Sequence, residues 1–78
     1  MNTVSLSSLR PGTDCRLQEL LVYGAMRRRL RDLGFLEGAR LHCAYIAPSG
    51  TPMAVYCKGT LIALRREDCR RIQVQICA

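Results

Sequence analysis

Residues 53–64, MAVYCKGTLIAL, contain the clearest pair of strands in this sequence of 78 residues. Two apolar runs flank Lys58-Gly59, and a two-residue loop that ends in glycine is typical of a tight β-hairpin. The pattern predicts strands over 53–57 and 60–64. Leu61 is out of phase with the other apolar side chains of its strand, so we expect it to point outward.

Three further stretches, 15–22, 39–47 and 72–76, alternate as strands do. In 39–47 the alternation places Leu41, Cys43 and Tyr45 on one buried face. In 15–22 the apolar phase breaks near Glu19, which predicts a β-bulge.

About five short strands and one short inserted helix make this a mainly β protein. Because rolling up a small sheet hides its edges, we expect a small, partly open β-barrel. The leucines at positions 6 and 9, which precede the turn at Pro11-Gly12, should lie on the domain.

Residues 24–33 predict the helix. Apolar residues recur at spacings of three and four, as on one face of a helix, and Gly34 follows where a left-handed cap favours glycine. The apolar stripe consists of Tyr23, Met26, Leu30 and Leu33. The other side carries Arg27, Arg28 and Arg31, and Arg28 is placed to pair weakly with Asp32.

The charge balance favours an acidic partner. Twelve basic and six acidic residues give a net charge of +6, and eleven of the twelve basic residues are arginine. Guanidinium groups suit carboxylate and phosphate groups. The acidic partner could therefore be a protein face, a phosphate group or a nucleic acid, and the composition does not choose among them. The alternative to a docking face is that the arginines of the helix only contact solvent. The candidate partner-binding residues are Arg27, Arg28, Arg31, Phe35, Leu36 and Leu61.

The five cysteines do not form a recognisable ligand set. Their odd number argues against a disulfide framework, and no Cys-x-x-Cys pair occurs. We expect most of them to be small buried side chains, with Cys77 the most exposed thiol. Convergence of Cys43, Cys57 and a third ligand on a metal is the alternative. No metal site and no cofactor are predicted.

Catalytic groups are scarce, which predicts that the protein is not an enzyme. His42 is the only histidine, and it lies within a strand, where a solvated side chain is the expected role. No glycine-rich phosphate loop is present. The longest apolar run, residues 20–26, is too short to span a membrane, and the first residues lack the basic start and apolar stretch of a secretory signal, so we expect none.

The segment GAMRRRLRDLGF, residues 24–35, resembles the helix-and-cap motif of the FeoA family, ferrous iron transport protein A. Three further segments, LSSLRPG at 6–12, APSGTP at 47–52 and ALRRED at 63–68, resemble the same family in the same order. Together the four segments extend over nearly the whole chain.

This resemblance implies a single SH3-like domain over residues 1–78, with the helix inserted after the first strand. It implies a small cytoplasmic accessory protein of bacterial ferrous iron uptake, not inserted in the membrane. The expected partner is FeoB, the membrane transporter with a cytosolic GTP-binding region, which the protein would dock on and modulate. The resemblance does not decide between a monomer and a homo-oligomer.

Two alternatives remain. The net charge and the arginine helix would suit a nucleic-acid-binding small β-barrel, but most of the four aromatic side chains are expected to face the core, so no nucleic acid is expected as partner. The cysteines and His42 would suit a metal-binding or metal-sensing protein.

Overall fold

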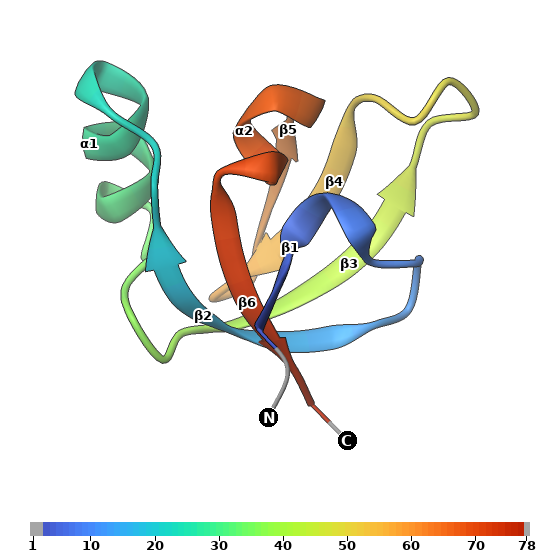
Figure 1. Cartoon of the computed structure of the whole chain (residues 1–78), viewed down its shortest axis with the longest axis horizontal. Helices are drawn as coiled ribbons and strands as arrows, with labels where there is room; N and C mark the ends of the chain where they lie inside the picture. The colour runs from blue at the N-terminus through green and yellow to red at the C-terminus, as the bar shows by residue number, and fades with distance from the viewer. Residues whose placement is uncertain (1–2, 78) are drawn as a thin grey trace.

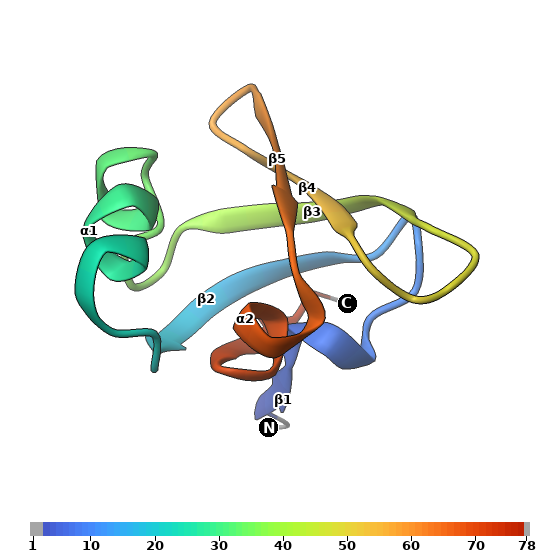
Figure 2. The same cartoon turned by 90° about the horizontal axis from the view of Figure 1, so that it is seen from above.

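The computed structural model describes residues 3–77, which form one antiparallel sheet of six strands in the order β1-β6-β2-β3-β4-β5. The strands are β1 (Thr3–Ser5), β2 (Asp14–Leu20), β3 (Arg40–Ile46), β4 (Met53–Cys57), β5 (Thr60–Leu64) and β6 (Ile72–Ile76), and the helical segments are η1 (Leu6–Ser8), α1 (Gly24–Asp32) and α2 (Arg66–Arg70). The sheet curls into a barrel-like shape without closing (Figure 1). Figure 2 shows α1 on one side of this curl, and Figure 1 shows α2 at its top, where it leads into β6.

The sequence predicted the hairpin with its bounds. Lys58 and Gly59 both have positive φ angles, 51° and 81°, as a type I′ turn requires. The strand β1 was missed, because three residues with two hydroxyl side chains carry no apolar alternation. It forms only by pairing with β6, Val4 opposite Val74, at the far end of the chain.

Two β-bulges change which side chains face the core. The register between β2 and β6 shifts between Leu17 and Glu19, which confirms the predicted bulge and allows Leu17 and Leu20 both to be buried. A second shift, between Cys43 and Tyr45 in β3, was not predicted. The expectation that Tyr45 shares the buried face of Cys43 is wrong: its side chain is 55% exposed.

The core fills the inside of the curl, and every strand except β1 contributes fully buried side chains to it. Leu6 and Leu9 are buried in it, as expected. The expectation for the cysteines is also confirmed, because four of the five are buried: Cys15, Cys43, Cys57 and Cys69.

Helix α1 is held against the sheet by few contacts. Leu30 is 1% exposed and Phe35, just after the helix, is 0% exposed. The backbone N–H of Phe35 donates to the Leu30 carbonyl oxygen at 2.9 Å, and Gly34 between them has a φ of 106°. The predicted stripe is wrong at Tyr23, which is 75% exposed at the helix start.

Gly34 also permits a close approach between α1 and the β4–β5 hairpin. A Cβ atom at this position would lie 2.9 Å from Cδ of Lys58 and 3.5 Å from Sγ of Cys57. The glycine is therefore required by its backbone angle, whereas the close contact with the flexible Lys58 side chain could be relieved by a shift of that side chain. No helix within residues 3–77 has the length and apolar character that crossing a membrane requires.

Replacing Leu30 with alanine should destabilise the fold by about 2–5 kcal/mol, because a fully buried leucine leaves a cavity when it is truncated. The matched control is Leu61→Ala, which should change the free energy of unfolding by less than about 0.5 kcal/mol because Leu61 is 53% exposed. Urea unfolding followed by circular dichroism measures both. Equal losses in the two variants would contradict this account of how α1 is held.

Candidate functional site

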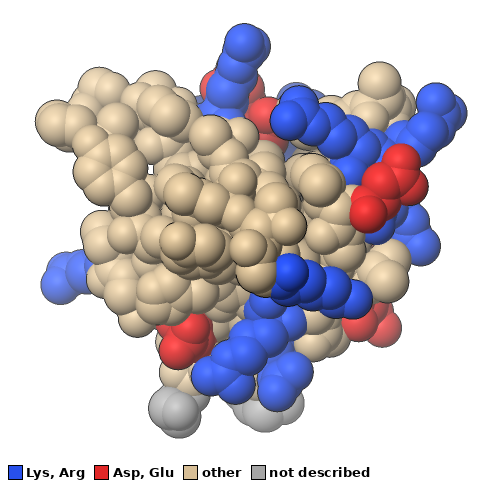
Figure 3. Space-filling view, turned by 180° about the vertical axis from the view of Figure 1, so that it is seen from behind, with Lys and Arg blue, Asp and Glu red and all other residues tan. Residues whose placement is uncertain are grey.

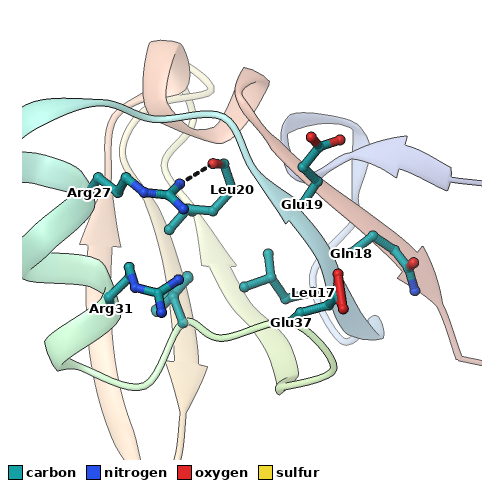
Figure 4. Close-up of a pocket in the computed structure, with 8 residues that line it drawn as sticks. Leu17, Gln18, Glu19, Leu20, Arg27, Arg31 and Glu37 are labelled. Carbon is teal, nitrogen blue, oxygen red and sulfur yellow. Dashed lines mark hydrogen bonds between the residues drawn. The ribbon is translucent and has the colours of Figure 1, made fainter.

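A pocket of about 210 Å³ lies between α1 and β2. Two arginines of the predicted partner-binding set, Arg27 and Arg31, reach into it from successive turns of α1 (Figure 4). The Arg27 guanidinium donates a hydrogen bond to the carbonyl oxygen of Leu20 at the end of β2. The other residues lining the pocket are Leu17, Gln18, Glu19, Leu20, Phe35 and Glu37.

The arginines of α1 form no ion pair within residues 3–77. Both ion pairs found in residues 3–77 involve Asp14, and neither includes an α1 arginine. The predicted pair between Arg28 and Asp32 is therefore not formed. The guanidinium group of Arg31 makes no hydrogen bond within residues 3–77. This group is therefore available to a carboxylate or phosphate of another molecule.

The predicted partner-binding residues do not form one surface. Arg28 lies over a shallow groove with Ala25 and Leu33, apart from the pocket that Arg27 and Arg31 line. Leu36 and Leu61 are exposed, 40% and 53%, on different elements. Phe35 has no exposed side-chain surface, because Gly34 turns the chain back and places it in the core, so we leave it out of the docking surface.

Sequence reasoning missed a row of side chains that crosses four strands on the outside of the sheet. The strand registers place Asp14 opposite His42, His42 opposite Tyr56, and Tyr56 opposite Leu61. Nδ1 of His42 lies 2.8 Å from Oδ1 of Asp14, and the His42 and Tyr56 ring centroids are 6.4 Å apart. His42 is thus paired with Asp14 and only half-buried, and it lies between Asp14 and Tyr56 in this row.

Asp14 is the charged anchor of this row. The hydrogen bond from His42 is the main cause that lowers the pKa of the Asp14 carboxyl group, and the positive charge of Arg40, whose Nη2 lies 3.6 Å from Oδ2, acts in the same direction. Asp14 therefore stays ionised at neutral pH. Its carboxylate fixes the His42 ring beside Tyr56.

An exposed apolar surface extends from this row. We call it the outer tyrosine face; it consists of Tyr45, Tyr56, Leu61 and Ala63 on β3, β4 and β5. Figure 3, which shows the molecule from behind, has a broad area without charged side chains, with more basic than acidic side chains around its borders. The expectation that most aromatic side chains face the core is wrong, because Tyr23, Tyr45 and Tyr56 are exposed and only Phe35 is buried.

The cysteines are positioned as packing residues. Burial raises the pKa of the Cys15 and Cys69 thiols to about 12, and it also raises the pKa values of Cys43 and Cys57. Within residues 3–77, no three side chains of histidine, cysteine, aspartate or glutamate are grouped so that they could hold a metal ion. The hypothesis of a cysteine-based metal site gains no support from this arrangement.

The fold defines a small SH3-like β-domain with one basic helix on its surface. The sequence model of the FeoA domain matches residues 4–76, so this chain belongs to the FeoA family. The resemblance of the four sequence segments to this family is thereby confirmed. Among curated proteins none matches the chain.

Solved structures agree with this assignment. The FeoA protein from Chlorobium tepidum is 39% identical, with a TM-score of 0.91 over 96% of this chain and 71% of that chain. The zinc complex of Stenotrophomonas maltophilia FeoA, described as a prokaryotic SH3 domain protein, is 33% identical, with a TM-score of 0.76 over 92% of this chain and 89% of that chain. IdeR from T. acidophilum shares only the fold, at 17% identity and a TM-score of 0.84 over 99% of this chain and 35% of that chain.

Thiol titration of the native protein should detect one rapidly reacting cysteine, because Cys77 alone among the five is not buried. The other four should react only as the protein unfolds, since burial disfavours the thiolate that reacts. Ellman's reagent with and without guanidinium chloride measures this, and Cys77→Ser is the control that removes the rapid phase. Two or more rapid thiols in the native protein would contradict the packing described above.

Proposed function

We propose that this protein is a cytoplasmic accessory factor of bacterial ferrous iron uptake, and that it docks on the cytosolic GTP-binding region of the transporter FeoB and modulates it. Membership of the FeoA family, which is associated with ferrous iron transport, is the observation that carries the proposal. The related Stenotrophomonas maltophilia protein is described as a candidate activating factor of ferrous iron transport.

The surface of α1 supports a docking role. Four arginines and one aspartate in nine residues give this helix a net charge of +3. A basic helix with an exposed leucine, Leu36, following its cap suits an acidic protein surface with an apolar contact at its centre. We therefore propose Arg27, Arg28, Arg31 and Leu36 as the principal contacts, with Leu61 as a separate one.

Reversing the charge of α1 with Arg27→Glu, Arg28→Glu and Arg31→Glu should weaken binding to purified FeoB cytosolic region at least about tenfold, which corresponds to ~1.4 kcal/mol. The physical reason is the loss of paired charges and the repulsion that replaces them. Isothermal titration calorimetry measures the affinity. Growth on limiting ferrous iron in a strain that lacks the native gene gives the cellular readout.

The matched control reverses three exposed arginines elsewhere, Arg10, Arg70 and Arg71, and changes the net charge by the same amount. It should retain affinity within about threefold if the contact is local to α1. Circular dichroism checks that both variants fold, and an Arg28→Glu, Arg31→Glu variant keeps the hydrogen bond from Arg27. If wild-type protein fails to bind FeoB and its loss leaves iron uptake normal, the proposal is wrong.

Nucleic-acid binding is the second candidate, because the exposed tyrosines supply stacking surfaces that the sequence did not predict. Tyr45 and Tyr56 lie on one face of a protein with a net charge of +6. Stacked bases are typically worth about 1–3 kcal/mol each, and phosphate contacts make affinity fall steeply with salt.

If nucleic acid is a ligand, single-stranded RNA or DNA should bind at low salt, and Tyr56→Ala should weaken binding about tenfold or more, the equivalent of one lost stack. Tyr23→Ala is the control, since Tyr23 lies at the start of α1, away from β3 and β4. Fluorescence anisotropy from 25 to about 200 mM salt measures the affinity. The absence of binding at the lowest salt removes this candidate.

A further inference from the structure

The strand β5 leaves one edge of the sheet open. It is the last strand in the sheet order and pairs only with β4. Cys57 and Thr60 close the type I′ turn, so they exchange both backbone hydrogen bonds, and bonded pairs then recur at every second residue. The N–H and C=O groups of Leu61 and Ala63 therefore point away from β4. No other backbone or side-chain hydrogen bond found in residues 3–77 uses these groups.

The side chains along this edge are accessible as well. Leu61 is 53% exposed and Ala63 is also exposed, and both belong to the outer tyrosine face. An added strand would thus continue an apolar surface already present on β3, β4 and β5. Prolines and β-bulges are two of the usual features that protect a sheet edge from pairing. β5 contains neither of them.

Positive charge marks both ends of the open edge. Lys58 lies in the turn before β5 and Arg65 follows its last residue; both are exposed. Residues 58–66, KGTLIALRR, contain three basic and no acidic residues. Among the described residues, neither Lys58 nor Arg65 has an acidic partner within 4.0 Å. These two basic residues would therefore favour a docked strand that carries acidic residues at both of its ends.

We propose that the open edge of β5 docks an extended segment of a partner protein, which pairs antiparallel with Leu61 and Ala63 and carries carboxylates opposite Lys58 and Arg65. Backbone hydrogen bonds would supply the pairing, and the charged ends would select the partner. The inference goes beyond the docking role of α1, because it uses a different surface and does not require that the partner be FeoB.

The same charges disfavour a second copy of this chain as the occupant. If two β5 strands pair antiparallel so that Leu61 of each lies opposite Ala63 of the other, the end of the edge that carries Lys58 in one copy meets the end that carries Arg65 in the other, twice in one dimer. Like charges directly opposite each other destabilise paired strands. An acidic strand meets no such repulsion.

The probe is a capped peptide of about eight residues, matching the span 58–65, with alternating threonine and valine and a glutamate at each end. Titrated into ¹⁵N-labelled full-length protein, it should shift the amide resonances of Leu61 and Ala63 and slow their hydrogen exchange. A peptide with lysine in place of each glutamate should bind about tenfold more weakly or worse, since each end then meets a like charge.

Two variants separate strand pairing from simple contact. Ala63→Pro removes the outward N–H without breaking the β4 ladder and should reduce binding at least about tenfold, whereas Ala63→Val keeps the N–H and should bind within about twofold. A peptide methylated on the backbone nitrogens that face β5 makes the same test without altering the protein, in case Ala63→Pro does not fold. Methylation of the nitrogens that face away should have little effect.

Each other outcome overturns the proposal. Absence of shifts with the acidic peptide, equal binding of both peptides, or shifts confined to α1 would show that this edge does not dock acidic strands. A concentration-dependent dimer that Ala63→Pro dissociates would make a second copy the occupant instead. Sedimentation velocity over a range of protein concentrations tests this last case.

Discussion

The burial of Leu30 and Phe35 in the curled sheet fixes the position of α1, and the surface chemistry of the protein depends on it. The two side chains are connected by one backbone hydrogen bond across Gly34, whose positive φ turns the chain back toward the core. The same glycine lets the hairpin side chain of Lys58 pass close to the helix end. Because of this anchor, Arg27 and Arg31 line the pocket beside β2.

A domain of this size has only enough apolar side chains for one core, so the other surface of its sheet stays in contact with water. The inner face holds the buried leucines and four cysteines, and the outer face exposes Tyr45, Tyr56 and Leu61. The protein therefore presents two surfaces of different chemistry: a basic one on α1 and an apolar one on β3, β4 and β5 that ends at an open edge.

Local sequence patterns predicted much of the fold because their causes are local. The two positive φ angles at Lys58 and Gly59 form the hairpin turn, and the alternation of Ile72 and Val74 with glutamines forms β6. The bulge in β2 was predictable because Leu17 and Leu20, both apolar, have opposite phases. The bulge in β3 was not, because a tyrosine fits either an inward or an outward position and so leaves the alternation unbroken.

Chain-local chemistry thus specified most of the elements, the cap at Gly34, the burial of most cysteines and the excess of arginine. Contacts between distant segments specified the rest: the addition of β1 to β6, the inward position of Phe35, and the pairing of Asp14 with His42 across 28 residues of sequence. These features depend on strand register and on how α1 packs. Register is a property of two strands together, so no single segment of the sequence contains it.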